Sequence, residues 1–157
     1  MSLERINALL VSSQVVEQTE ASLRAAGREG YELFVLWSGV VDGERFVVRT
    51  AHVPRQTSYR TEDGLLVRVE GEALHKLNCW LYENGERLAV QVHAHPTDAF
   101  HSDTDDAFPM VTTLGGFSIV LADFAGAGLL AASTRAFRLA AGGWLEAGPV
   151  KRLVEVT

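Results

Sequence analysis

Two histidines separated by one residue are the feature of this chain that is best suited to chemistry. They lie in the stretch His93-Ala94-His95-Pro96, which follows the apolar and polar run 87–92. Successive side chains of a strand point to opposite faces, so residues i and i+2 project from the same face. Neutral imidazole nitrogens are good zinc ligands, and three protein ligands leave a fourth position open for water, as in catalytic zinc sites. The pattern therefore predicts a metal site.

The loop after the histidines supplies candidates for a third ligand. Ser102 follows His95 by seven residues, and Asp105 comes three residues after Ser102. Residues i and i+3 of one helical turn lie on the same side, which favours a common role for the serine and the aspartate. Ser102 is also suited to cap the N-terminus of a short helix over 103–108. From spacing alone, Asp105 is a weaker candidate ligand than either histidine.

Hydrolysis of an amide also needs a carboxylate that takes a proton from water and returns it to the leaving amine. Glu32 is the upstream candidate, because it stands at the start of the otherwise apolar stretch 31–41. A charge at such a position is unfavourable unless it faces solvent or a functional cleft. The spacing of residues does not by itself bring Glu32 next to the two histidines.

Together these pieces resemble the motif of the JAMM metallopeptidases, which are also called MPN+ or JAB proteins. That motif has a glutamate at the start of an apolar strand, then His-x-His-Pro, then Ser-x-x-Asp. Glu32 and Gly39 keep the spacing of the family's first strand, while Val35 stands where an inner glycine is usual. The order of the expected elements also agrees, and the resemblance extends over residues 6–140.

The resemblance implies a role for each of these residues. His93, His95 and Asp105 would bind one catalytic Zn²⁺ ion. Glu32 would be the general base and then the general acid. Ser102 would hydrogen-bond the developing oxyanion or the bound water.

The spacing departs from the family pattern in one place. Six residues, 96–101, separate the second histidine from the serine, where the family usually has seven. Keeping the Ser-x-x-Asp spacing selects Asp105 as the third ligand, whereas counting from His95 selects Asp106. We favour Asp105, because the i,i+3 relation places it on the same side as Ser102 and a loop absorbs a deletion easily.

The resemblance also implies a substrate class. Similar family members remove ubiquitin or ubiquitin-like proteins from targets, or trim such a modifier at its C-terminus. A chain of 157 residues is similar to the stand-alone prokaryotic JAB proteins. Those often accompany activating and conjugating enzymes of ubiquitin-like pathways, including antiviral defence operons. Two alternatives stay open: a JAB hydrolase that acts on the tail of a sulfur-carrier protein, and a non-catalytic MPN scaffold that binds a partner protein.

Composition and charge limit the function classes. The chain is 47% hydrophobic and 22% charged, which is typical of a globular protein, and its length predicts a single domain over residues 1–157. A formal charge of −6 argues against nucleic acid or an anionic membrane as the partner. No apolar run approaches the roughly 20 residues of a membrane span. The single cysteine, Cys79, excludes an internal disulfide and a multi-cysteine zinc cage, and a cytoplasmic location is the simplest expectation.

The spacing of apolar residues predicts the elements that must position these groups. Strands without strict βαβ alternation predict an α+β fold, with a central mixed β-sheet flanked by helices. The resemblance implies the same fold as a JAB/MPN-type domain of cytidine deaminase-like architecture. We expect helices over 13–27, 71–83 and 103–108, a mobile loop over 54–63, and strands over 6–11, 31–41, 45–53, 65–69, 87–94, 117–124 and in short pieces within 135–156.

Overall fold

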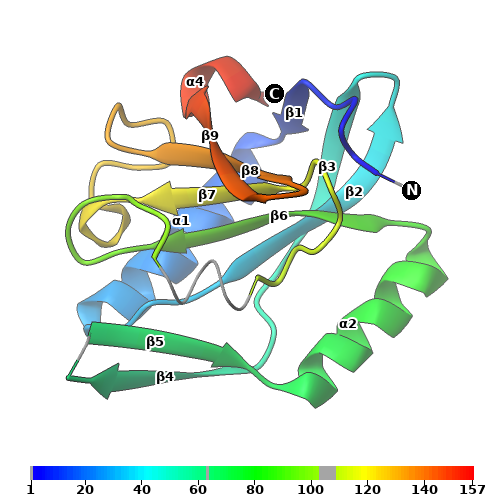
Figure 1. Ribbon diagram of the computed structural model, residues 1–157. Coiled ribbons are helices and arrows are strands. Elements are labelled where there is room, and N and C mark those ends of the chain that lie inside the picture. Colours follow the sequence, from blue (N-terminus) through cyan, green and yellow to red (C-terminus); the bar gives the residue numbers. More distant parts are fainter. Residues whose placement is uncertain (1, 63, 103–108) are drawn as a thin grey trace.

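A mixed sheet flanked by helices makes up the centre of the molecule (Figure 1). The computed structural model describes residues 2–62, 64–102 and 109–157. Its helices are α1 (Ser13–Arg28), α2 (Gly71–Asn84) and α4 (Val150–Leu153), with a 3-10 turn η1 (Asp123–Ala125). Its strands are β1 (Ala8–Val11), β2 (Val35–Asp42), β3 (Arg45–His52), β4 (Gln56–Thr61), β5 (Gly64–Val69), β6 (Arg87–Ala94), β7 (Phe117–Leu121), β8 (Arg135–Ala140), β9 (Gly143–Pro149) and β10 (Val154–Val156).

Eight of the described strands form one sheet in the order β10-β1-β3-β2-β6-β7-β8-β9. The pairs β1–β10, β1–β3 and β6–β7 are parallel, and the pairs β2–β3, β2–β6, β7–β8 and β8–β9 are antiparallel. The predicted fold class, α+β with a central mixed sheet and flanking helices, is therefore confirmed. None of the helices in the described ranges combines the length and the apolar character needed to cross a membrane.

Helix α1 covers one face of the sheet. Its N-cap is Ser12, whose hydroxyl accepts a hydrogen bond from the Val15 N–H at 3.2 Å. On β2, Trp37 donates its indole N–H to the hydroxyl of Thr19 at 2.9 Å, and both side chains are fully buried. Because the indole N–H has this acceptor, Trp37 can fill the large core under α1 without leaving an unsatisfied polar atom. Val15, Val16 and Leu23 of α1 belong to the same core.

Helix α2 packs against the opposite face through a smaller cluster. Leu36 alternates with the residues of β2 that face α1, and it packs with Leu77 and Leu81 of α2. The helix ends at Gly85, which has a φ of +63°. Glycine adopts this left-handed conformation without strain, so it is well suited to end the helix.

The register of β6 decides which residues share the face covered by α2. Gln91 lies directly opposite Leu36, so both side chains project from that face. His93, two residues later, projects from it as well. Strand β6 is central, between β2 and β7, and its residues from Ala89 to Ala94 are all buried. The first histidine of the motif is therefore held by a buried central strand.

Two expectations about the segments around the site are wrong. The mobile loop expected over 54–63 is not found in its described part, because Gln56–Thr61 form β4 and pair with β5 as a two-stranded antiparallel sheet; residue 63 lies outside the described residues. Their polarity reflects exposure, since most side chains of β4 are exposed. The second strand begins at Val35 rather than at residue 31, so Glu32 precedes the strand instead of opening it. The helix expected over 103–108 lies outside the described residues.

Candidate metal centre

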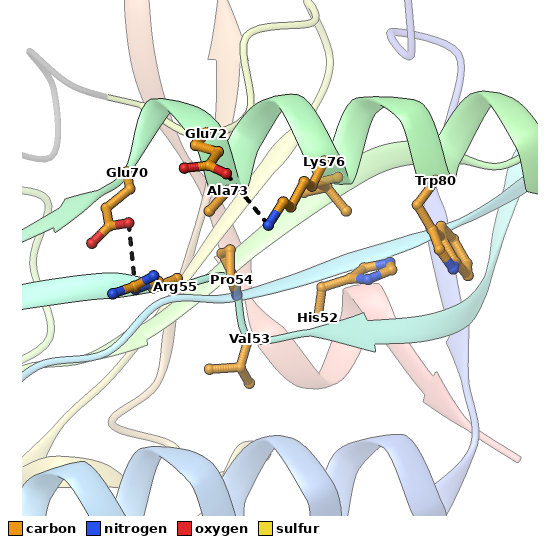
Figure 2. Close-up of a pocket in the computed structure, with 10 residues that line it drawn as sticks. His52, Val53, Pro54, Arg55, Glu70, Glu72, Ala73, Lys76 and Trp80 are labelled. Atoms are coloured by element: carbon orange, nitrogen blue, oxygen red, sulfur yellow. Dashed lines mark ion pairs between the residues drawn. The ribbon is translucent and has the colours of Figure 1, made fainter.

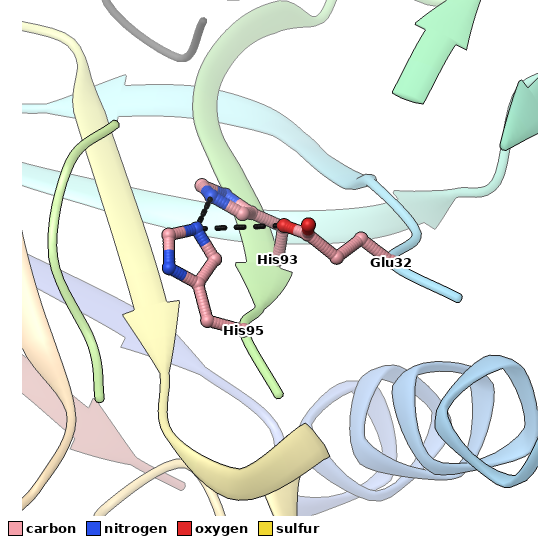
Figure 3. A group of neighbouring side chains, drawn as sticks. All are labelled: Glu32, His93 and His95. Atoms are coloured by element: carbon pink, nitrogen blue, oxygen red, sulfur yellow. Dashed lines mark hydrogen bonds and ion pairs between the residues drawn. The ribbon is translucent and has the colours of Figure 1, made fainter. Parts of the chain in front are cut away.

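Glu32, His93 and His95 come together in space (Figure 3). The Nε2 atoms of the two histidines are 3.2 Å apart, and Nε2 of His95 is 3.4 Å from Oε1 of Glu32. One ligand atom from each residue lies within 4.8 Å of the other two. Sixty residues of sequence separate Glu32 from His93, so the fold and not local chain geometry creates this cluster.

The donor set and its spacing fit a zinc ion. Zinc binds imidazole nitrogen and carboxylate oxygen at about 2.0–2.2 Å, so two ligands of a tetrahedral site lie about 3.3 Å apart. The observed separations of 3.2 Å and 3.4 Å match that edge length. Two imidazole nitrogens and a carboxylate oxygen that converge at this spacing can hold a divalent cation. They can equally hold it with two residues while the third contacts a water molecule beside it.

The cluster is largely withdrawn from solvent. The side chains of His95 and Glu32 are 5% and 11% exposed, and His93 is 1% exposed. The ring of Phe34 lies 4.6 Å from that of His93, and Phe100 lies edge-on at 4.5 Å from His95. Apolar walls of this kind lower the local dielectric constant, which strengthens the interaction of an ion with its ligands.

The backbone around His95 is held from both sides. The N–H of His95 donates to the carbonyl of Leu121 at 2.9 Å, which extends the parallel pairing of β6 with β7 by one bond. The carbonyl of His95 accepts from the N–H of Phe124 at 2.8 Å. Phe124 belongs to η1, where Asp123, Phe124 and Ala125 all have positive φ values of 50° to 66°. In this left-handed turn, the N–H groups of Asp123 and Phe124 donate to the carbonyls of Thr97 and His95.

The remaining predicted site residues are placed less fully. Ser102 is described as half-buried, directly after His101 in the loop that follows β6. Asp105 and its alternative, Asp106, lie outside the described residues. The roles of Ser102 and of the third ligand therefore stay predictions.

Sequence reasoning missed a buried polar network beside the cluster. Gln91 is fully buried, and its Oε1 accepts hydrogen bonds from the N–H groups of Met110 and Val111 at 2.8 and 2.9 Å. Its Nε2 donates to Ser118 Oγ at 3.2 Å, and His101 Nε2 is 3.1 Å from the same hydroxyl. These bonds fix the chain on both sides of residues 103–108. The available signal was an amide in an apolar strand, two residues before the first histidine.

A second polar group lies outside the cluster, near a pocket between α2 and the segment after β3 (Figure 2). Ser38 donates to Glu86 Oε1 at 2.8 Å and lies 2.7 Å from His52 Nε2. The ring of His52 packs edge-on against Trp80 at 4.7 Å. Burial lowers the pKa of His52, and the nearby Glu86 carboxylate opposes that shift. Serine links the histidine and the glutamate here, whereas in a hydrolytic triad the histidine links the other two.

Comparison with known proteins gives three results. No model of a known protein family matches the chain. The solution structure of protein DSY2949 from Desulfitobacterium hafniense aligns with a TM-score of 0.66 and 16% identity, over 95% of this chain and 92% of that one, and shows a shared fold. The "Probable metalloprotease y4jG" of Sinorhizobium fredii is 38% identical over 159 residues, which cover 99% of this chain and 98% of the relative. The chain therefore belongs to the same protein family as that probable metalloprotease.

Proposed function

We propose that the chain is a zinc-dependent peptidase of the JAMM type. The single observation that carries this proposal is the convergence of Glu32 with His93 and His95, because a glutamate beside a histidine pair is what metal-assisted amide hydrolysis requires. The printed name of the 38% identical relative, a probable metalloprotease, supports the same class of reaction.

In this proposal His93, His95 and Asp105 hold the ion, with Asp106 as the alternative third ligand. When bound there, zinc supplies Lewis-acid chemistry, which polarises a carbonyl group and lowers the pKa of water to about 7. The low exposure of His93, His95 and Glu32 limits the water that reaches the cluster.

Glu32 is the proposed acid–base group of the reaction. Its carboxylate accepts a proton from the attacking water and then gives that proton to the departing nitrogen. Its Oε1 lies 3.4 Å from Nε2 of His95, so it reaches the region where the nucleophile must form. Ser102 is proposed to donate its hydroxyl to the oxyanion of the tetrahedral intermediate, as an oxyanion-hole donor does.

We propose as the substrate the C-terminus of a ubiquitin-like protein, either in an isopeptide bond to a lysine or as a fusion. The order and spacing of the motif residues support this choice through the resemblance to JAMM proteins. We expect the chain to act in the cytoplasm, together with enzymes that activate and conjugate such a modifier.

A cleavage assay tests the proposal. The substrates are a ubiquitin-like protein fused through its C-terminus to a reporter, and a sulfur-carrier protein fused in the same way. We expect zinc-loaded wild type to cleave the first, and Glu32→Gln to lose about 10²–10⁴-fold in rate, as is usual when a general base is removed. The matched control is Glu29→Gln, an exposed glutamate three residues away, which is expected to keep full activity.

Zinc content measured on the same proteins separates the possible roles. We expect Glu32→Gln to retain zinc and His93→Ala to lose it. Loss of zinc from Glu32→Gln would instead make Glu32 a ligand. Cleavage of the sulfur-carrier fusion alone would replace the substrate class, and zinc-loaded wild type that cleaves neither fusion would overturn the peptidase proposal.

A further inference from the structure

Three alternate side chains of β4 bind the backbone that carries Glu32. Gln56 accepts from the N–H of Phe34 at 2.7 Å and donates to its carbonyl at 3.0 Å. Ser58 donates its hydroxyl to the carbonyl of Glu32 at 2.8 Å. Arg60 donates to the carbonyl of Gly30 at 3.4 Å. We call this set of bonds from Gln56, Ser58 and Arg60 the β4 ladder.

The spacing of the β4 ladder follows from strand geometry. Residues 56, 58 and 60 share one face of β4, because side chains alternate along a strand. Their partners 34, 32 and 30 have the same two-residue period in the opposite direction. Side chains therefore replace the backbone bonds that an antiparallel neighbour would supply. Gln56 copies them most closely, since one amide satisfies both the donor and the acceptor of Phe34.

The segment that the ladder binds needs such support. Residues 31–34 precede β2 and are not assigned to a strand or helix. The hydrogen bonds to the carbonyls of Glu32 and Phe34 are part-buried, and backbone polar groups withdrawn from water require partners. The Glu32 side chain extends from this segment to the histidines, so a shift of its backbone moves the carboxylate by a comparable distance.

The hairpin that carries the ladder is itself closed at its base (Figure 2). The N–H of Glu70 donates to the carbonyl of Arg55 at 3.2 Å, and their side chains form an ion pair at 3.5 Å. Between these two residues, β4 and β5 pair in unbroken register from Gln56–Val69 to Thr61–Gly64. Gln56 is therefore the ladder residue nearest to the fixed base, and its amide also donates to the carbonyl of Pro54 at 2.9 Å.

We propose that the β4 ladder sets the position of Glu32, and that Gln56 and Ser58 are positioning residues for the reaction. This inference rests on the proposed function, in which Glu32 is the general base. Misplacement of a reacting group by about 1 Å can cost about 100-fold in rate. The ladder therefore makes hydrolysis depend on a hairpin that does not itself carry a predicted ligand or base.

Kinetics of the full chain test the catalytic half of the inference. Gln56→Ala and Ser58→Ala are expected to lower kcat by between about 10- and 100-fold while KM and zinc content stay unchanged. Ser58→Thr keeps the hydroxyl and is expected to restore kcat. The matched control is Thr57→Ala on the opposite face of the same strand, which is exposed and is expected to behave as wild type. Unchanged kcat in both ladder variants would overturn the inference.

A double variant separates positioning from a general loss of structure. If Gln56 acts through Glu32, Gln56→Ala lowers the residual rate of Glu32→Gln no further, because residues of one catalytic unit are not additive. A full additional loss in the double variant means that Gln56 acts elsewhere, and it overturns the positioning role.

Amide hydrogen exchange tests the structural half without any substrate. The Phe34 N–H donates to Gln56, so Gln56→Ala is expected to speed exchange in a peptide covering residues 31–36, whereas Thr57→Ala leaves it unchanged. Unaltered exchange in Gln56→Ala would overturn the ladder. Wild type that cleaves nothing, with exchange responding as expected, would overturn the proposed function and leave the ladder as the device that holds the segment.

Discussion

The turn that holds the backbone of His95 by a hydrogen bond is itself strained. The turn that donates to its carbonyl has three consecutive non-glycine residues with positive φ values, Asp123, Phe124 and Ala125. Each such residue costs about 1–3 kcal/mol, so neighbouring contacts must hold the turn. Arg24 of α1 donates to the carbonyl of Ala125 at 3.0 Å. Helix α1 therefore supports the candidate metal centre from the far face of the sheet.

The residues of the candidate site differ in how far the sequence predicts their positions. The histidine pair was found from its spacing on a strand, because the two-residue period needs no knowledge of the fold. The structure places Glu32 beside that pair, which spacing alone does not predict. Gln91 was missed because a single buried amide has no periodic signature, although it bonds to Met110, Val111 and Ser118.

His52 supplies a pH prediction. Burial lowers the pKa of its imidazole, with Glu86 opposing, so the unfolded chain binds this proton more readily than the native protein. Neutral His52 therefore contributes to the free energy of unfolding. This contribution is complete above the unfolded pKa of about 6.5, and it is lost as the pH falls from there toward the lower native pKa. We expect wild type to lose stability more steeply between pH 7 and pH 5 than His52→Gln does, in urea unfolding at each pH. Parallel pH curves for the two proteins would contradict this assignment.

At the scale of elements, prediction succeeded where one face of an element is apolar. The stripe of α1 and the alternation of β6 reproduce their observed bounds closely, because burial of one face determines both patterns. Strand β4 was missed because both of its faces are polar, one toward solvent and one toward the backbone of residues 30–34. Polar side chains that bind backbone groups give the same sequence pattern as the polar residues of an exposed loop.

Gly39 in β2 is a position where a single added methyl group is expected to destabilise the fold. It lies at an irregularity in the pairing of β2 with β3, where a Cβ would overlap the carbonyl oxygen of Val47. That oxygen belongs to the backbone of a paired strand and cannot rotate away. Gly39→Ala is therefore expected to lower the free energy of unfolding by about 1–3 kcal/mol.

Urea denaturation measures this effect. The matched control is Gly142→Ala in the turn between β8 and β9, where a Cβ would meet no atom within 4 Å. Equal unfolding midpoints for Gly39→Ala and wild type would show that the strand moves to accommodate the methyl group.

In the complete fold, the last strand forms one edge of the large sheet, beside the first strand. Strand β10 pairs in parallel with β1, and Thr157 donates its N–H to the carbonyl of Val11 at 2.9 Å. Val154 in β10 is only 5% exposed. The general class of fold was predictable from the mixture of elements. The pairing of β10 with β1 was not, because pairing between distant strands depends on the complete topology.

Deletion of residues 154–157 tests how much the pairing of β10 with β1 contributes to thermal stability. Burial of a valine contributes about 1.5–3 kcal/mol, and 1 kcal/mol shifts Tm by about 2–4 °C in a chain of this size. We expect the truncated protein to melt at least about 3 °C below wild type, as followed by circular dichroism. The substitution Glu155→Gln, at an exposed position of the same strand, is the control and is expected to leave Tm unchanged. An unaltered Tm after deletion would show that β1 needs no neighbour on that side.

The closed base of the β4–β5 hairpin has a consequence for how such a protein can diverge. The chain leaves and re-enters the domain at one point, between Arg55 and Glu70, so a different insert can be grafted there without changing the register of the large sheet. Any replacement also takes away the bonds that hold the backbone of Glu32. A new insert must therefore evolve together with residues 30–34, so that the hairpin and the segment before β2 are expected to change as one unit.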